Sequence, residues 1–203
     1  MYTEVIFDLE TQRFFDEIGE FDASKLGVSV VSVYSRTIDE NFKEIEGKIQ
    51  SFWEDDLSGL WDLFTRADRI VGFNSKHFDA VVLKPYTSIN LQKLPHFDIL
   101  EHIREVNGKR VSLNSIAKET LGDHKADDPR NAILYWQKRD KESLRLLKFY
   151  CEEDVRLTKE IYDYGLKNMK LRFKDYWNTI REIEVDFSYP KIEKIQEKQV
   201  SLF

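Results

Sequence analysis

The first element that the chain predicts is an apolar run leading into two carboxylates. In the stretch TEVIFDLETQ the apolar residues favour a buried strand, whose side chains alternate between its faces. Ile6, Asp8 and Glu10 therefore share one face, and Phe7 and Leu9 share the other. Two like charges about 7 Å apart on a desolvated face need a compensating partner, such as a divalent cation. The alternative is an edge strand with both acids in water.

The remainder of the first hundred residues predicts strands separated by helices. Apolar and β-branched runs favour strands at residues 26–34, 41–45, 69–73 and 96–100. Helical spacing favours helices at residues 57–65 and from a cap at Asn74 or Ser75 to about Tyr86. Three strands in succession favour an antiparallel meander.

The second half is mostly helical in pattern. It first predicts a helix capped by Ser112 and stopped by Gly122, followed by a polar loop at 122–131. A long helix from Lys141 to Tyr164 then ends near Gly165. The last predicted elements are a β-hairpin within 169–187, turning at 177–179, and a flexible charged tail at 190–203. This order predicts an α/β fold with a mixed β-sheet flanked by helices and a C-terminal β-hairpin appendage.

Composition narrows the class of protein. The chain has 203 residues, 41% hydrophobic and 33% charged, which is typical of one globular domain. No apolar stretch approaches the about 20 residues that span a bilayer, so we expect a cytoplasmic protein without a membrane partner. The single cysteine, Cys151, fits a reducing compartment and excludes a cysteine-rich zinc site. Oxygen ligands would therefore hold any metal, which favours Mg²⁺ or Mn²⁺.

Charge is distributed unevenly along the chain. The formal net charge is −6, and residues 1–70 hold 16 acids against 7 bases. Residues 104–148 reverse this balance, with 11 Lys and Arg against 7 Asp and Glu. The basic middle is either a solvated helical face or a surface that contacts nucleic acid.

Two further acids stand at positions that suggest a site. Asp79 lies in the first turn of the predicted helix that follows a buried strand, where it either points toward the strand end or stabilises the helix dipole. Asp154 interrupts the apolar stripe of the 141–164 helix, whereas Glu152 and Glu153 lie off that stripe and are expected to be solvated. Tyr150, about one turn before Asp154, is either a core aromatic or a hydroxyl directed at the same site.

Three motifs resemble those of a known superfamily. FDLET, GFNSKHFD and YCEED, in this order over residues 3–165, resemble the exonuclease motifs of the DEDD superfamily of ribonuclease H-like 3′–5′ exonucleases. That superfamily includes polymerase proofreading domains and RNase D-type enzymes. Three residues separate Tyr150 from Asp154, and Phe149 stands where the histidine branch has His, so the third motif resembles the tyrosine (DEDDy) branch.

The resemblance implies a two-metal site. Asp8, Glu10 and Asp154 would hold one ion, and Asp8 would bridge to a second ion near Asp79. Paired Mg²⁺ or Mn²⁺ ions about 3.5–4 Å apart stabilise the attacking water and the leaving 3′ oxygen. Tyr150 would orient the water, since its ordinary pKa near 10 makes it a poor free base at pH 7.

The resemblance also implies substrate contacts. Leu9, Thr11, Asn74 and Phe78 match positions near the substrate terminus, although packing and capping explain Asn74 and Phe78 equally well. The basic stretch would border the substrate channel, and its candidate phosphate contacts are Lys109, Arg110, Lys118, Lys125 and Arg130. His77 and His124 match no role and are expected at the surface.

The chain ends in QVSLF, which is Gln199, Val200, Ser201, Leu202 and Phe203. This ending resembles the pentapeptide by which bacterial replication and repair proteins bind the β sliding clamp. Its Leu-Phe pair would insert two apolar anchors into a pocket while Gln fixes the register. The alternative is an incidental apolar terminus.

These observations predict a metal-dependent 3′–5′ exonuclease that acts on single-stranded or frayed nucleic acid, DNA if the tail is a clamp ligand, in DNA replication or repair. The alternatives are an RNase D-like exoribonuclease and a non-catalytic nucleic-acid-binding adaptor tethered to a clamp. The expected parts are a ribonuclease H-like domain at 1–168, a β-hairpin extension at 169–189 and a flexible tail at 190–203 with the clamp-binding-like motif.

Overall fold

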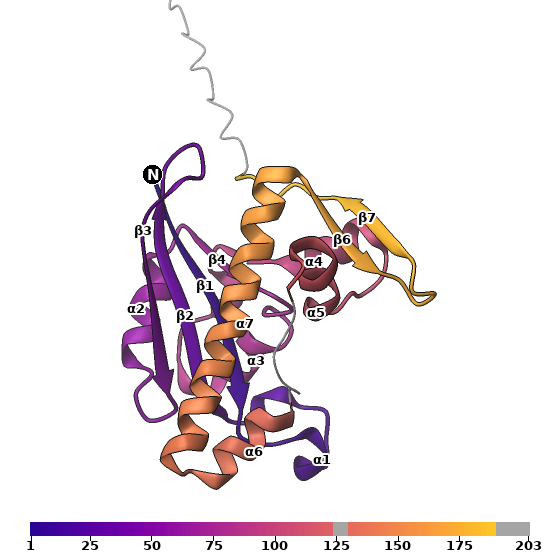
Figure 1. The fold of residues 1–203 in the computed structure, drawn as a ribbon. Coiled ribbons are helices and arrows are strands. Elements are labelled where there is room, and N and C mark those ends of the chain that lie inside the picture. The colour runs from indigo at the N-terminus through magenta and orange to yellow at the C-terminus, as the bar shows by residue number, and fades with distance from the viewer. Residues whose placement is uncertain (124–129, 190–203) are drawn as a thin grey trace, which may run out of the picture.

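The computed structural model describes residues 1–123 and 130–189, and a five-stranded sheet lies at its centre (Figure 1). The strands are β1 (Tyr2–Thr11), β2 (Val28–Ile38), β3 (Glu44–Trp53), β4 (Arg69–Gly72) and β5 (His96–Asp98). Their order is β3-β2-β1-β4-β5, with β1 to β3 antiparallel and β4 and β5 parallel to β1. The predicted meander and mixed sheet are confirmed, and β1 is central rather than an edge strand.

Helices cover both faces of this sheet. They are α1 (Phe15–Ile18), α2 (Ser58–Arg66), α3 (Asp79–Leu83), α4 (Ile99–Asn107), α5 (Leu113–Ile116), α6 (Arg130–Lys138) and α7 (Lys141–Asn168), with a π-helical turn at Ala117–Leu121 and 3₁₀ turns at Ala23–Lys25, Lys84–Tyr86 and Leu91–Lys93. The long α7 crosses one face, and α2 lies on the other (Figure 1). Within the described ranges, no helix is both long and apolar enough to cross a bilayer.

The alternation along β1 decides which side chains meet which helix. Phe7 and Leu9 are buried in the core cluster that includes Phe64 of α2. Ile6 packs in a separate cluster with Val155 of α7. Each such apolar burial stabilises the fold by about 1.5–3 kcal/mol. The face that Ile6 shares with Asp8 and Glu10 is therefore the one that α7 covers.

The bounds of the second and third strands were partly wrong. β2 begins at Val28, because Gly27 adopts a left-handed conformation with φ of +72°, and it continues to Ile38. β3 extends to Trp53, far beyond the predicted end at residue 45. It is an edge strand whose outer residues are largely exposed, so its sequence lacks a continuous apolar run.

Two boundaries after β4 also differ, and Asp98 explains both. Residues 74–78 form a turn, so α3 begins at Asp79 rather than at a cap on Asn74 or Ser75. The Asp98 carboxylate accepts hydrogen bonds from the backbone of Asn74 and Lys76, which holds the turn. Asp98 also caps α4 through the backbone of Leu100, so β5 ends there and the predicted strand at 96–100 was too long.

Several helices differ from the pattern-based expectation. α1 and α4 were not expected, and α6 begins at Arg130, inside the predicted loop at 122–131. The helix capped by Ser112 and stopped by Gly122 is confirmed, although its second half is π-helical. α7 continues past Gly165 to Asn168. Gly165 serves packing instead of ending the helix, because a Cβ there would collide with the Phe187 ring.

The C-terminal hairpin is present as predicted, with strands β6 (Lys170–Lys174) and β7 (Ile180–Glu184). Its base is fastened to the core, since Leu171 and Phe187 are fully buried in the α7-side cluster. Arg69 of β4 donates hydrogen bonds to the carbonyl oxygens of Phe187, at 2.6 Å, and Ser188, at 3.1 Å. The division of the chain at residues 168 and 189 stays a prediction, and the tail 190–203 lies outside the described residues.

Candidate metal centre

Three carboxylates converge where β1 meets α7. One carboxylate oxygen from each of Asp8, Glu10 and Asp154 lies within 4.8 Å of the other two. Asp154 is only 4% exposed, whereas Asp8 and Glu10 on the strand are partly exposed. An all-oxygen set of this kind suits a hard divalent cation, whose ligands on opposite sides lie about 4.2 Å apart at Mg–O distances of about 2.1 Å. The residues thus fit a metal ion after a small closure.

Cys151 joins the helix to the strand at this point. Its Sγ donates a hydrogen bond to the carbonyl oxygen of Asp8 at 3.4 Å, and the side chain is fully buried. Burial first, and then the neighbouring charges of Asp8 and Glu10, raise the pKa of the Cys151 thiol. The thiol therefore stays protonated at neutral pH and fixes α7 against β1 near Asp154.

A β-bulge follows the two strand acids. Glu10 pairs with Val30 but Thr11 pairs with Val28, so Ser29 is the extra residue between them. The bulge bends β2, the strand that carries the extra residue, opposite the end of β1, and bulges beside functional sites are common. The Thr11 hydroxyl donates a hydrogen bond to the carbonyl oxygen of Arg13, two residues further along the chain, at 3.2 Å. The site thus lies at the end of β1, where the regular pairing of β1 with β2 is interrupted.

Asp79 lies beside the three carboxylates without belonging to the 4.8 Å group. It is 4% exposed, and its carboxylate receives a backbone hydrogen bond from Leu9, which places it against β1. Burial, opposed by backbone hydrogen bonds, combines with the negative charges of Asp98 and Asp154 to raise the pKa of Asp79 to about 7. Cation binding nearby would favour the ionised form.

The turn before Asp79 is held by Asp98, which sequence reasoning did not single out. Asp98 is 2% exposed, and its carboxylate accepts hydrogen bonds from four backbone amides, those of Asn74, Lys76, Leu100 and Glu101. Asn74 takes a left-handed conformation with φ of +64°, which asparagine tolerates better than most residues. Ser75 also contacts His96 Nε2 at 2.8 Å. An Asp directly before a helical pattern was the available signal for this cap.

The four predicted substrate-contact residues lie around this end of the sheet. Asn74 Oδ1 accepts a hydrogen bond from Arg110 at 3.0 Å. Phe78 packs against the α2-side core and faces the Phe15 ring with centroids 6.4 Å apart. Leu9 is 4% exposed and belongs to that same core, and Thr11 is 7% exposed. Packing therefore accounts for Leu9 and in part for Phe78.

Tyr150 lies on α7 about one turn before Asp154. It is 6% exposed and belongs to a core cluster with Trp136 of α6 and Leu147 of α7. Its ring thus has the packing role that the first alternative proposed. Its place on the helix also keeps its hydroxyl a candidate for orienting water.

The other predicted residues divide by position. Lys109, Arg110, Lys118 and Arg130 are exposed, as is His77, with a 58% exposed side chain. Glu152 is not simply solvated, because its carboxylate accepts a hydrogen bond from Ser51 at 2.8 Å. His124, Lys125 and the pentapeptide from Gln199 to Phe203 lie outside the described residues.

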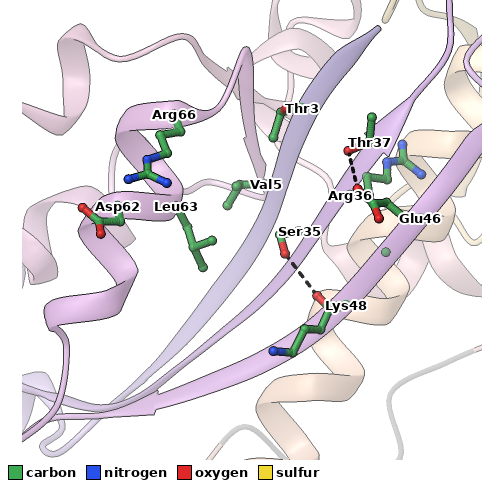
Figure 2. Close-up of a pocket in the computed structure, with 11 residues that line it drawn as sticks. Thr3, Val5, Ser35, Arg36, Thr37, Glu46, Lys48, Asp62, Leu63 and Arg66 are labelled. Carbon is green, nitrogen blue, oxygen red and sulfur yellow. Dashed lines mark hydrogen bonds between the residues drawn. The ribbon is translucent and has the colours of Figure 1, made fainter.

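A separate cavity lies near the opposite end of β1. It encloses about 340 Å³ between α2 and the sheet, with Thr3, Lys48 and Arg66 in its lining (Figure 2). Asp62 and Glu46 contribute its acids, from different elements (Figure 2). The converging carboxylates, rather than this cavity, form the candidate functional site.

The fold and the acidic group together define an α/β protein with a candidate site for a divalent cation. Residues 5–165 match the family model RNase_H_2, described as RNase_H superfamily. The chain belongs to the RNase H superfamily. Membership suggests a metal-dependent nuclease and supports a role in processing nucleic acid. A comparison with curated proteins gives no significant match.

Proposed function

We propose that the protein is a two-metal-ion 3′–5′ exonuclease of the DEDDy type. It hydrolyses single-stranded or frayed nucleic acid, with DNA favoured, to nucleoside 5′-monophosphates. The observation that carries this proposal is the convergence of Asp8, Glu10 and Asp154 beside Asp79 on a fold of the RNase H superfamily.

Each carboxylate has a distinct task in this proposal. Asp8, Glu10 and Asp154 would hold one cation, and Asp8 and Asp79 would hold a second. When bound, divalent ions at these carboxylates would supply positive charge to the attacking and leaving oxygens of an in-line displacement. Tyr150 orients the attacking water by hydrogen bonding, and Asn74 and Phe78 meet the terminal nucleotide.

The raised pKa of Asp79 gives the site a direction of pH dependence. With a pKa of about 7, a large share of Asp79 carboxyl groups is protonated at neutral pH. A cation must displace that proton, so its affinity should rise as the pH rises through 7. Activity at limiting metal should follow the same trend.

The choice of DNA rests on the tail. Residues Gln199 to Phe203 would tether the enzyme to a bacterial sliding clamp, which works on DNA, and would place it in replication or repair. The rival exoribonuclease keeps the same site and differs only in substrate. Comparing hydrolysis of DNA and RNA of identical sequence discriminates the two.

The decisive test incubates 5′-labelled single-stranded DNA and RNA with Mg²⁺, Mn²⁺ or a chelator. The wild-type protein should produce a ladder that shortens from the 3′ end only with metal. Asp8→Asn and Asp154→Asn should remove the ladder, a loss on the order of 10³-fold. Glu152→Gln, which neutralises a neighbouring acid on α7, is the matched control and should retain activity.

Two outcomes would reject the proposal. A ladder that persists in both aspartate variants would show that other residues, or a contaminant, cut the strand. Absence of metal-dependent hydrolysis on every substrate would favour the non-catalytic adaptor. A 3′-terminal phosphorothioate adds a polarity control, because it should protect the strand if cleavage begins there.

A further inference from the structure

A groove lies between the C-terminal hairpin and the segment that joins α4 to α5. It has a volume of about 530 Å³. The core side contributes Lys109, Arg110 and Ser112, and the hairpin contributes Lys174, Trp177 and Arg181. In Figure 1 the hairpin projects beside α4 and α5, away from the central strands.

The groove carries an excess of positive charge. Its two acids are already paired, Asp175 with Arg181 at 2.7 Å and Glu182 with Arg172 at 2.8 Å. Lys109 and Arg110 are exposed, and neither forms an ion pair with any residue in 1–123 or 130–189. Both cations are therefore available to an anionic ligand.

Exposed aromatic rings stand beside these cations. Tyr176 is 95% exposed and Trp177 is 70% exposed, although such side chains are usually buried in a monomer. Their ring planes are nearly perpendicular, at 87°, and their centroids lie 6.0 Å apart. Lys109 Nζ lies 5.8 Å from the centre of the Trp177 ring. Rings and cations thus occupy one surface.

A hydrogen bond connects this surface to the turn that precedes Asp79. Arg110 donates from Nη2 to Asn74 Oδ1 at 3.0 Å. Asn74 begins the turn that leads to Asp79, and β4 runs parallel to β1, so the turn lies next to the strand end that carries the acids. A ligand in the groove could therefore continue into the site.

We propose that this groove binds the single-stranded part of a nucleic-acid substrate, and the inference rests on the proposed function. Lys109 and Arg110 contact phosphates, and Tyr176 and Trp177 stack on bases. Cations interleaved with exposed rings are the usual platform for single strands, which offer both a charged backbone and open π faces. The strand would thus be held upstream of the nucleotide that is removed.

The test measures binding of a fluorescent oligothymidylate by anisotropy, with a chelator present so that no cleavage occurs. Tyr176→Ala combined with Trp177→Ala should weaken binding by about tenfold or more. Tyr176→Phe combined with Trp177→Phe keeps both rings and should retain most of the affinity. All four substitutions lie at exposed positions, so the variants should fold, which circular dichroism checks.

Salt dependence tests the phosphate contacts separately. Affinity for the strand falls as salt rises. Lys109→Ala combined with Arg110→Ala should make the negative slope of log affinity against log salt shallower by about 1.4, because each single-strand phosphate contact contributes about 0.7. Lys48→Ala combined with Arg66→Ala removes the same charge from the lining of the other cavity (Figure 2) and should leave the slope unchanged.

Two readouts separate this inference from the proposed function. Hydrolysis of the p-nitrophenyl ester of thymidine 5′-monophosphate needs the metal centre but not the groove, so the Tyr176 and Trp177 alanine variant should retain it. A wild-type protein that binds the strand but does not hydrolyse it would reject only the proposed function. Unchanged strand affinity in both alanine pairs would overturn the groove assignment and would favour a protein ligand for the exposed rings.

Discussion

The face of β1 that packs against α7 carries Glu4 near one end and Asp8 with Glu10 near the other. Glu4 is fully buried, and its carboxylate accepts hydrogen bonds from Arg36 at 2.8 Å, Tyr162 at 2.8 Å and Tyr189 at 2.9 Å. Donors therefore surround this acid on several sides. Such a buried carboxylate is a structural element.

The other end of the same face gathers acids beside acids. Asp8 and Glu10 approach Asp154, and the charges of Asp98 and Asp154 contribute to the raised pKa of Asp79. Like charges gathered in one place repel one another, so the arrangement suits a bound cation. The surrounding groups, rather than the residue type, distinguish the structural acid from the candidate ligands.

The largest difference between the two ends should appear in stability. Glu4→Gln removes the fully buried carboxylate that pairs with Arg36, which keeps only the more exposed Asp163 and Glu44, and should lower the free energy of unfolding by about 3 kcal/mol. Asp8→Asn should lower stability less than Glu4→Gln, because Asp8 is partly exposed and lies beside other acids. Urea denaturation measures both, with Glu46→Gln on the exposed strand β3 as the control. Equal losses of unfolding free energy in Glu4→Gln and Asp8→Asn would contradict the proposed difference between the two ends of the strand.

Added metal should act at one end only. At about 100 times its dissociation constant, Mg²⁺ or Mn²⁺ should stabilise the wild type by about 2.7 kcal/mol. Asp8→Asn and Asp154→Asn should lose most of this gain, whereas Glu4→Gln should keep it relative to its own metal-free state. Thermal unfolding of each protein with and without metal measures this gain in stability. A metal-induced stabilisation that survives both aspartate variants would place the cation elsewhere.

A pH experiment probes the turn that carries Asp79. Burial lowers the pKa of His96 to about 4, and His96 contacts Ser75 in that turn. In the unfolded chain the His96 imidazole takes up a proton near pH 6.5, whereas in the folded protein it stays neutral. The neutral buried His96 therefore contributes its full stability above pH 6.5, and that contribution is lost as the pH falls toward 4. Between pH 8 and pH 5 the loss should be about 2 kcal/mol. Urea titrations of the wild type and His96→Gln should show a smaller pH dependence in the variant.

The smallest effect concerns the contact that joins α7 to Asp8. Cys151→Ala removes a buried thiol and its hydrogen bond to the Asp8 carbonyl, and it should lower stability by about 1 kcal/mol. Catalytic turnover should fall by less than tenfold, because all four carboxylates remain. Cys151→Ser keeps a donor at this position. If both variants lose turnover equally, the loss does not follow from the hydrogen bond.

Local patterns were sufficient to predict much of the fold. The alternation along β1 indicated which residues share a face, and the alternation after residue 169 indicated the hairpin. The grouping of Asp8, Glu10 and Asp154 came from motif resemblance, because no spacing along the chain brings residue 154 to residue 8. Pattern reasoning thus worked where a residue's role depends on its chain neighbours or on a recognised motif.

Features that depend on distant partners were missed. Glu4 looks like an exposed strand residue until Arg36 and Tyr162 are placed beside it. Asp98 contacts a turn more than twenty residues earlier, and Gly165 is a packing residue only because Phe187 lies against it. The role of each is set by three-dimensional packing, which a single sequence does not reveal.

The hydrogen bonds from Arg69 to the carbonyl oxygens of Phe187 and Ser188, just after the hairpin, have a further consequence. Arg69 belongs to β4, so the base of the hairpin is fastened to the same sheet that carries Asp8 and Glu10. The distance from the aromatic tip of the hairpin to the candidate metal centre would then be fixed. If strands bind as proposed, affinity should rise in a step once an oligonucleotide is long enough to reach both ends, and shorter products should dissociate.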